Sequence, residues 1–429
     1  MKKLMFFAIA AAGLLTSCTS EDNFDAGAVS QDFTADGRMP IEISMGKVAT
    51  VNTRGTGTVG DTTGTATNVW RNQRVNILMF KKGTLDLALI DSLENPYPIY
   101  DRTEFRTQSI DGSFRNRALD MTDSIKYYPT RGMFDFWGYR LDGADAGFTA
   151  PVTTSNITAD VKRVYYPGDT LKLDFKIDGT QDVMAAKAEP SAVDLASRAD
   201  AAARAFSAFS ARNGVQPELI FKHLLTRLNF VIIAGDSSAT GVRGIYVDTI
   251  SVKSKTTGKL IAAYAGSTRV ADENLIQWED AKEDLFLMRR PTPADPSWDA
   301  TEPAENQNLV ELDPVAPTGT GGPFTNDFVA DSVKIGEALL VAPDSEYIID
   351  VKMHQTVIIK DDGVNPAETV VKTFSTSDKL KPAGGDPFQM GHTYKVAIKL
   401  YGLSDIRITT TLTGWQEGEI IPITPEDNY

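Results

Sequence analysis

The sequence has few of the residues that most often carry chemistry. Its one cysteine in 429 residues, Cys18, allows no disulfide bond within a chain, so stability has to come from packing and backbone hydrogen bonds. The three histidines, His223, His354 and His392, lie far apart, and no pair has the spacing of metal ligands. P-loop, nucleophile-elbow and zinc-protease motifs are absent from the sequence. We therefore predict a non-enzymatic protein with no catalytic residue, no metal site and no cofactor.

Positive charge is also scarce. The chain has 43 Lys and Arg against 57 Asp and Glu, a formal net charge of −14. Without residues 1–17, which contain Lys2 and Lys3 and no acid, 41 basic residues remain and the net charge is 41 − 57 = −16. Such a chain is repelled by nucleic acid and by anionic lipid. We expect no nucleic-acid partner.

Long apolar runs are missing except near the start of the chain. Lys2 and Lys3 precede the uncharged stretch Leu4–Leu15, which is too short to span a membrane as a helix. Leu15-Thr-Ser-Cys18 follows and looks like a lipoprotein signal, so residues 1–17 are predicted to be removed and Cys18 to be lipidated, with palmitate among its acyl groups. An ordinary secretory signal with an accidental cysteine is the alternative.

Residues 18–37 read as a flexible tether, because they are small and polar. The acidic residues directly after Thr19 and Ser20 resemble an export tag for the outer face of the outer membrane. Surface exposure is the expectation, and retention in the periplasm is the other reading.

Short alternating apolar runs separated by turn residues dominate the remaining chain, which predicts an all-β fold of sandwiches. In Thr393–Leu400, for example, Tyr394, Val396 and Ile398 share one face, while the lysines point the other way. Two stretches break the pattern. Ser191–Asn213 is Ala-rich, and Leu195, Phe206 and Phe209 predict an apolar helical stripe ended by Gly214. Residues 291–330 are rich in Pro and Gly and predict a long loop.

A set of short motifs occurs in order along nearly the whole chain and resembles one family. The motifs are Cys18, Thr53-Arg54-Gly55, Val75–Phe80, Tyr127-Tyr-Pro129, Phe134–Tyr139, Asp182–Lys187, Leu219–Phe230, Leu339–Pro343, Tyr347–Val351, Met390–Tyr394 and Trp415. They resemble those of the fimbrillins, the lipoprotein subunits of type V pili. The resemblance implies two tandem transthyretin-like β-sandwich domains, which we place at residues 38–237 and 238–429, with an Ala-rich helical insertion in the first.

The fimbrillin resemblance also implies a route to assembly. In that family an arginine-specific protease cuts after the first strand, and the groove that this strand leaves accepts the terminal strand of another subunit. Arg54 and Gly55 match the cleavage position, within a polar, glycine-rich run suited to a protease. The removable strand would carry Ile41, Ile43 and Met45 on one face. Arg38 is a second candidate, but a cut there would leave this strand in place.

Two C-terminal stretches have the alternation that a donor strand needs. One carries Ile406, Ile408 and Leu412, and the other carries Ile420, Ile421 and Ile423. Either is a candidate donor, and both are equally compatible with a permanent place in the second domain. The sequence leaves this choice open.

These expectations describe a surface lipoprotein of the outer membrane that enters a fimbria after processing. Its partners would be other fimbrillin subunits, a processing protease, the membrane through its lipid, and an unidentified surface ligand. The alternative is a monomeric carbohydrate-binding surface protein. A glycosidase comes third, because two carboxylates suffice for that chemistry but no Asp or Glu pair stands out. Gly55–Gly60 has dinucleotide-binding spacing without the required strand and helix. Trp137 and Tyr139 are predicted to be core residues before sugar-stacking ones.

Overall fold

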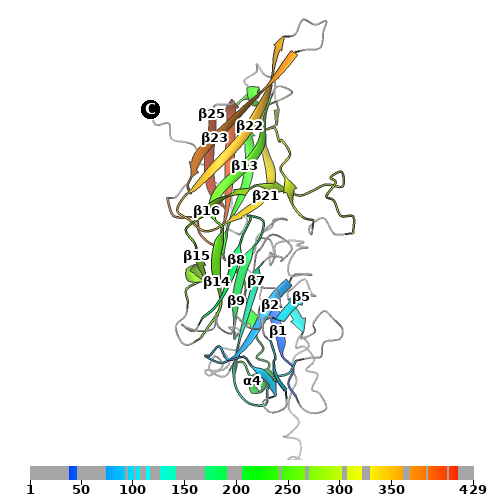
Figure 1. Ribbon diagram of the computed structural model, residues 1–429, viewed down its shortest axis with the longest axis vertical. Coiled ribbons are helices and arrows are strands. Elements are labelled where there is room, and N and C mark those ends of the chain that lie inside the picture. The colour runs from blue at the N-terminus through cyan, green and yellow to red at the C-terminus, as the bar shows by residue number, and fades with distance from the viewer. Residues whose placement is uncertain are drawn as a thin grey trace, which may run out of the picture.

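The structure is a computed structural model, which describes residues 38–45, 74–91, 95–100, 103–106, 113–115, 126–141, 170–190, 205–240, 244–265, 270–301, 307–320, 329–360, 368–382, 385–402 and 405–413. In these ranges almost all regular structure is β-strand, so the predicted all-β class is confirmed. None of the described helices is long and apolar enough to cross a membrane. The molecule is elongated, with a lower and an upper lobe along its long axis (Figure 1).

The lower lobe is built on an eight-stranded sheet. Its strands are β1 (Glu42–Met45), β2 (Arg74–Lys81), β5 (Thr103–Arg106), β6 (Ser113–Arg115), β7 (Phe134–Leu141), β9 (Val183–Glu189), β10 (Glu218–Leu219) and β11 (Lys222–His223). The order is β5-β2-β7-β9-β10-β1-β6, and β11 also pairs with β9. A short β3 (Leu89–Asp91)–β4 (Asn95–Pro98) hairpin accompanies it.

A three-stranded sheet completes the lower lobe. It contains β8 (Thr170–Lys176), β14 (Thr257–Tyr264) and β15 (Ile276–Trp278), in the order β15-β14-β8. The one described α-helix, α4 (Ala208–Arg212), lies at the bottom of the lobe (Figure 1).

The upper lobe consists of two four-stranded sheets that contribute to one core. The first sheet has the order β21-β12-β24-β25, formed by β12 (Thr226–Ala234), β21 (Ser332–Val341), β24 (Thr393–Gly402) and β25 (Asp405–Thr413). The second has the order β16-β13-β22-β23, formed by β13 (Ile245–Lys255), β16 (Lys282–Phe286), β22 (Tyr347–Lys360) and β23 (Glu368–Leu380). The far end of the β22–β23 hairpin projects from the top of the molecule (Figure 1).

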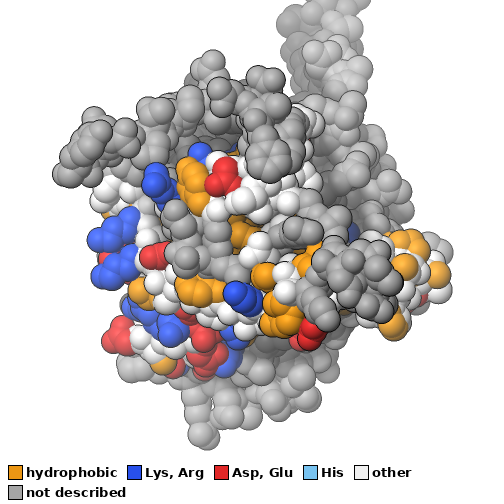
Figure 2. Space-filling view, turned by 90° about the horizontal axis from the view of Figure 1, so that it is seen from above, with side chains coloured by type: hydrophobic (Ala, Val, Ile, Leu, Met, Phe, Trp, Pro, Cys, Tyr) orange, Lys and Arg blue, Asp and Glu red, His pale blue; other side chains and the backbone are white. Residues whose placement is uncertain are grey.

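Smaller elements connect these sheets. They are the ladder of β17 (Met288–Arg289) with β18 (Val310–Glu311), the ladder of β19 (Gly319–Thr320) with β20 (Val329–Ala330), and the 3-10 helices η1 (Ser237–Ala239) and η2 (Asp272–Asn274). In the space-filling view, hydrophobic side chains lie in separate groups between charged side chains of both signs (Figure 2).

One nearly continuous strand passes through both lobes. Only Thr256 separates β13, which pairs with β22 of the upper lobe, from β14, which pairs with β8 of the lower lobe. The chain returns alongside, because β15 pairs with β14 and β16 pairs with β13. At the crossing point the Ile177 amide donates to the Thr256 carbonyl at 2.9 Å. The hairpin therefore ties the two lobes together through backbone hydrogen bonds.

The eight-stranded sheet is buried on both faces. In β2, Leu78 and Phe80 belong to a core cluster that continues into the upper lobe. Val75, Ile77 and Met79, on the opposite face of the same strand, belong to a second cluster confined to the lower lobe. We call this second cluster the lower core. Alternation in β24 is equally regular, with Tyr394, Val396, Ile398 and Leu400 buried as predicted.

The predicted domain boundary between residues 237 and 238 stays a prediction. Strands on the two sides of this boundary pair with one another in both lobes. β12, which precedes it, pairs with β21 and β24, which follow it. β14 and β15 follow it, but their sheet is completed by β8, which precedes it.

The helix predicted for Ser191–Asn213 is confirmed only at its C-terminal end. Residues 191–204 lie outside the described part, and only Ala208–Arg212 forms a helix, which Gly214 follows at φ +80°. Phe206 is buried, but it lies before the helix and exchanges backbone hydrogen bonds with Phe134. Phe209 is 57% exposed. The apolar stripe fails because Phe206 is placed by a strand-like contact rather than by helical spacing.

The predicted loop at 291–330 is only partly irregular. Its described portions include all of β18, β19 and β20. Val315 also forms an antiparallel bridge with Val247 in the upper lobe, with backbone hydrogen bonds of 2.9 and 3.0 Å. The Val315 bridge therefore connects this segment to β13 of the upper lobe.

Gly336 provides a test of packing in β21. Its φ of +63° disfavours other residues, and a Cβ here would lie 2.7 Å from Leu287 Cγ and 2.9 Å from the Met288 carbonyl oxygen. We expect Gly336→Ala to lower the free energy of unfolding by about 2–4 kcal/mol, from strain plus overpacking. Gly385→Ala is the control, because its φ is +78° but no atom lies within 4 Å of the new Cβ. Chemical denaturation of both variants measures the difference, and equal losses would contradict the packing contribution.

Candidate functional site

The predicted removable strand occupies an interior position of the lower-lobe sheet. β1 lies between β10, with which it is parallel, and β6, with which it is antiparallel. Ser44 is the residue at which both pairings meet, since it opposes Glu218 on one side and Ser113 on the other. Removal of β1 would leave a gap with a backbone edge on each side.

The apolar side chains of this first segment belong to the lower core. Met39, Ile41 and Ile43 are 2%, 0% and 3% exposed, so the predicted burial of the two isoleucines is confirmed. They share the cluster with Leu219 and Phe221. Full burial of three such side chains contributes about 5–9 kcal/mol in gross terms. The backbone of Met45 continues β1, but its side chain lies outside the described residues.

Hydrogen bonds hold the start of the segment. The Ile41 amide donates to the Lys126 carbonyl at 3.0 Å, and the Tyr128 amide donates to the Met39 carbonyl at 2.9 Å. Pro40 and Tyr127 form the antiparallel bridge between these two bonds. The segment is thus paired before β1 itself begins.

Gln216 adds a side-chain clamp on the same segment. Its Oε1 accepts from the Glu42 amide at 3.3 Å and from the Tyr128 hydroxyl at 3.4 Å. Its Nε2 donates to the Pro40 carbonyl at 3.4 Å. Sequence reasoning missed this residue, because an isolated Gln before a strand has no distinguishing pattern.

Tyr128 makes this clamp sensitive to high pH. Burial raises the pKa of the Tyr128 phenol well above its ordinary value, and the nearby Glu42 carboxylate raises the pKa further. The ring packs edge-on against Phe136, with centroids 6.0 Å apart. The neutral phenol is therefore the form that fits beside the first segment.

The first candidate donor strand forms the edge of an upper-lobe sheet. β25 pairs with β24 from Thr393 opposite Thr413 to Gly402 opposite Asp405. Ile408 is half-buried against the core cluster that continues from the lower lobe into the upper lobe. The side chains of Ile406 and Leu412, and all of Ile420, Ile421 and Ile423, lie outside the described residues. Whether either stretch acts as a donor stays a prediction.

The predicted modification positions fall outside the described residues as well. Cys18, Arg54 and Gly55 all belong to undescribed segments. The structure shows the strand before Arg54 and the strand β2 after it.

The histidines have local partners. His223 Nδ1 lies 2.6 Å from Asp182 Oδ2 in a buried pair, and His354 Nδ1 lies 2.6 Å from Asp248 Oδ1. His392 Nδ1 lies 2.8 Å from the Met390 carbonyl. Among the described residues, no group of three or more His, Cys, Asp or Glu is arranged to hold a metal ion.

Comparisons with known proteins give distant structural similarities alone. No family model matches the sequence, and no curated protein matches it. A protein of Bacteroides uniformis provisionally assigned to cell adhesion is 13% identical, with a TM-score of 0.40 over 89% of this chain and 99% of that chain. A fimbrial protein of Bacteroides vulgatus is 12% identical, with a TM-score of 0.39 over 80% and 92%.

The fimbrial anchor protein of Porphyromonas gingivalis is 8% identical, with a TM-score of 0.31 over 87% of this chain and 99% of that chain. Identities and TM-scores this low assign neither a family nor an activity. The functional reading depends on the geometry of the first strand.

Ile41 tests the packing of this segment. We expect Ile41→Ala to reduce the free energy of unfolding by about 2–4 kcal/mol, because it leaves a cavity in the lower core. The matched control is Ile359→Ala on β22, where the side chain is 56% exposed and the change should stay within about 0.5 kcal/mol. Denaturant titration compares the two. Similar losses would show that the first segment is not part of the core.

Tyr128 gives a pH prediction. A phenol whose pKa is raised in the folded state contributes stability that is complete below the unfolded pKa of about 10 and is lost as the pH rises beyond it. We expect Tyr128→Phe to weaken this alkaline loss. Thermal unfolding from pH 8 to 11 measures the effect, with Tyr127→Phe as control. The same alkaline slope in both variants would contradict a role for the buried phenol.

Proposed function

We propose that this protein is a structural or accessory subunit of an adhesive pilus, held at the outer membrane through Cys18 until processing. The observation that carries the proposal is the interior position of β1, with Ile41 and Ile43 in the lower core. Arg54 follows β1 in the sequence and precedes β2. One cut there would separate this strand from the rest of the chain.

Physical chemistry favours replacement of a strand removed from such a position. Its loss exposes the apolar residues that contacted Met39, Ile41 and Ile43, and it unpairs the facing edges of β10 and β6. A donor strand from another subunit would restore both contributions, through main-chain hydrogen bonds and apolar side chains at every second position. The groove therefore selects an extended segment with period-two alternation.

Two segments of this chain have this alternation, and either could act as the donor strand for a second copy of the chain. β25 already lies at an open sheet edge, and its removal from β24 would cost a full ladder of hydrogen bonds. The stretch containing Ile420, Ile421 and Ile423 follows β25 and carries the second apolar pattern. We propose this C-terminal region as the donor, without choosing between its two parts.

The test is maturation at Arg54. We expect protein recovered from the native cell surface to begin at Gly55 and to form high-mass ladders, and an Arg54→Ala strain to lose both. Arg38→Ala is the matched control, since a cut after Arg38 would leave β1 in place. Intact mass and N-terminal sequencing provide the measurement.

The opposite result is equally informative. A native chain that begins at an acylated Cys18 and stays monomeric would contradict strand exchange and favour the alternative, a monomeric carbohydrate-binding surface protein. A start at Gly55 that persists in the Arg54→Ala strain would exclude Arg54 as the processing residue.

A further inference from the structure

A pocket of about 210 Å³ opens in the lower lobe, on the side of the sheet facing β14. Its apolar lining includes Trp137, Ala185, Ile261, Ala262 and Leu275. These residues come from β7, β9, β14 and the segment between η2 and β15. The volume is suited to a single small group rather than to a drug-sized molecule.

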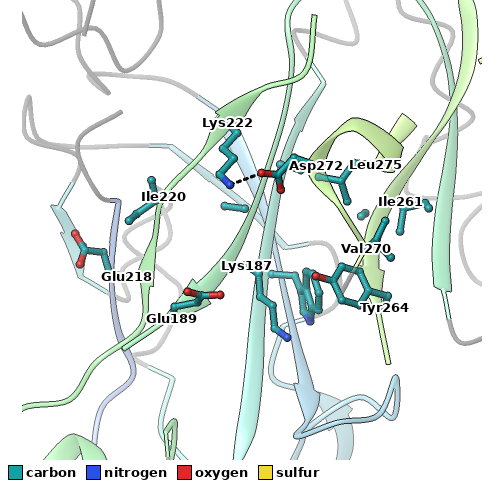
Figure 3. A pocket seen from close by; sticks show the side chains of 14 residues that line it. Lys187, Glu189, Glu218, Ile220, Lys222, Ile261, Tyr264, Val270, Asp272 and Leu275 are labelled. Atoms are coloured by element: carbon teal, nitrogen blue, oxygen red, sulfur yellow. Dashed lines mark hydrogen bonds and ion pairs between the residues drawn. The ribbon is translucent and has the colours of Figure 1, made fainter. Parts of the chain in front are cut away.

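A lysine and two aromatic rings form one wall. The rings of Trp137 and Tyr264 meet edge-on, with centroids 4.5 Å apart. Lys187 Nζ lies 4.8 Å from the Trp137 centroid and 5.4 Å from the Tyr264 centroid. Figure 3 shows the Lys187 side chain beside the Tyr264 ring. These contacts hold a positive charge at the pocket without neutralising it.

Carboxylates complete the rim. Glu189 and Glu218 line the pocket, and Asp272 lies opposite Lys187, paired with Lys222 at 2.5 Å (Figure 3). Within the part of the chain that the structure describes, Lys187, Glu189 and Glu218 form no ion pair and no side-chain hydrogen bond. The pocket thus offers one unpaired cation and two unpaired hydrogen-bond acceptors beside apolar lining residues.

We propose that this pocket binds one acidic sugar unit of a glycan. Lys187 would pair with the sugar carboxylate, and Glu189 and Glu218 would accept hydrogen bonds from its hydroxyl groups. An apolar face of the sugar ring would rest against the Tyr264 ring, which also lines the pocket. A phosphate dianion fits less well, because Lys187 can offset only one of its two negative charges and the unpaired Glu189 and Glu218 would repel the other.

The proposed sugar site is separate from the strand groove. Leu219 of β10 packs with Ile41 in the lower core, whereas its neighbour Glu218 points to the opposite face and lines the pocket. The pocket can therefore be tested on the intact chain, and its failure would leave the proposed strand exchange unaffected.

The experiment titrates the full chain with N-acetylneuraminic acid and glucuronic acid by calorimetry and saturation-transfer NMR. Galactose, sodium acetate and leucine serve as neutral, anion-only and zwitterionic probes. We expect saturable binding of at least one acidic sugar, and weaker binding of the other probes by about tenfold or more. High salt should weaken the binding of the acidic sugar, because its carboxylate would pair with Lys187.

Lys187→Gln should reduce the affinity for the acidic sugar by about tenfold or more, and Lys187→Arg should restore part of it. Lys253→Gln on β13 is the control, because it removes the same charge outside the pocket. Circular dichroism confirms that each variant is folded. The proposal would be overturned if neutral sugar or acetate bound as tightly as the acidic sugars, or if leucine bound more tightly than they do. It would also be overturned if no sugar bound saturably, or if Lys187→Gln left the affinity for the acidic sugar unchanged.

Discussion

The strand that continues from β13 into β14, interrupted only at Thr256, links the hydrogen-bond networks of both lobes. A strand that is hydrogen-bonded to β22 at one end and to β8 at the other fixes the direction of each lobe relative to the other. The returning strands β15 and β16 reinforce it, and one buried cluster continues across the junction. In a chain with a single cysteine, backbone ladders and packing perform the role that disulfides have in many exported proteins.

Burial of the eight-stranded sheet on both faces gives the lower lobe two separate surfaces. One face of β10 belongs to the core that holds the first segment, and the other face lines the pocket beside Lys187. The proposed strand exchange and the proposed sugar binding would therefore use the same sheet without sharing side chains. Because β10 has only two residues, little material separates the two sites.

Sequence patterns predicted the parts of this fold that depend on local alternation. The buried face of β24 and the burial of Ile41, Ile43, Trp137 and Tyr139 follow from period-two spacing and side-chain size. Features set by tertiary contacts were not predictable. Phe206 is positioned by backbone hydrogen bonds to Phe134, and helical periodicity carries no information about such a distant contact. The parallel pairing of β1 with β10 joins residues more than 170 positions apart, and Gln216 gains its role from contacts with equally distant residues, Pro40 and Glu42.

The first strand remains covalently joined to β2 through residues 46–73. Such a link presents the strand to its own groove at an effective concentration in the millimolar range. In the proposed strand exchange, a donor from a second molecule would compete against this internal strand, which cannot diffuse away, and polymerisation before processing would be disfavoured. A cut in the link would make this competition bimolecular, and dilution of the released strand would then favour its replacement by the donor.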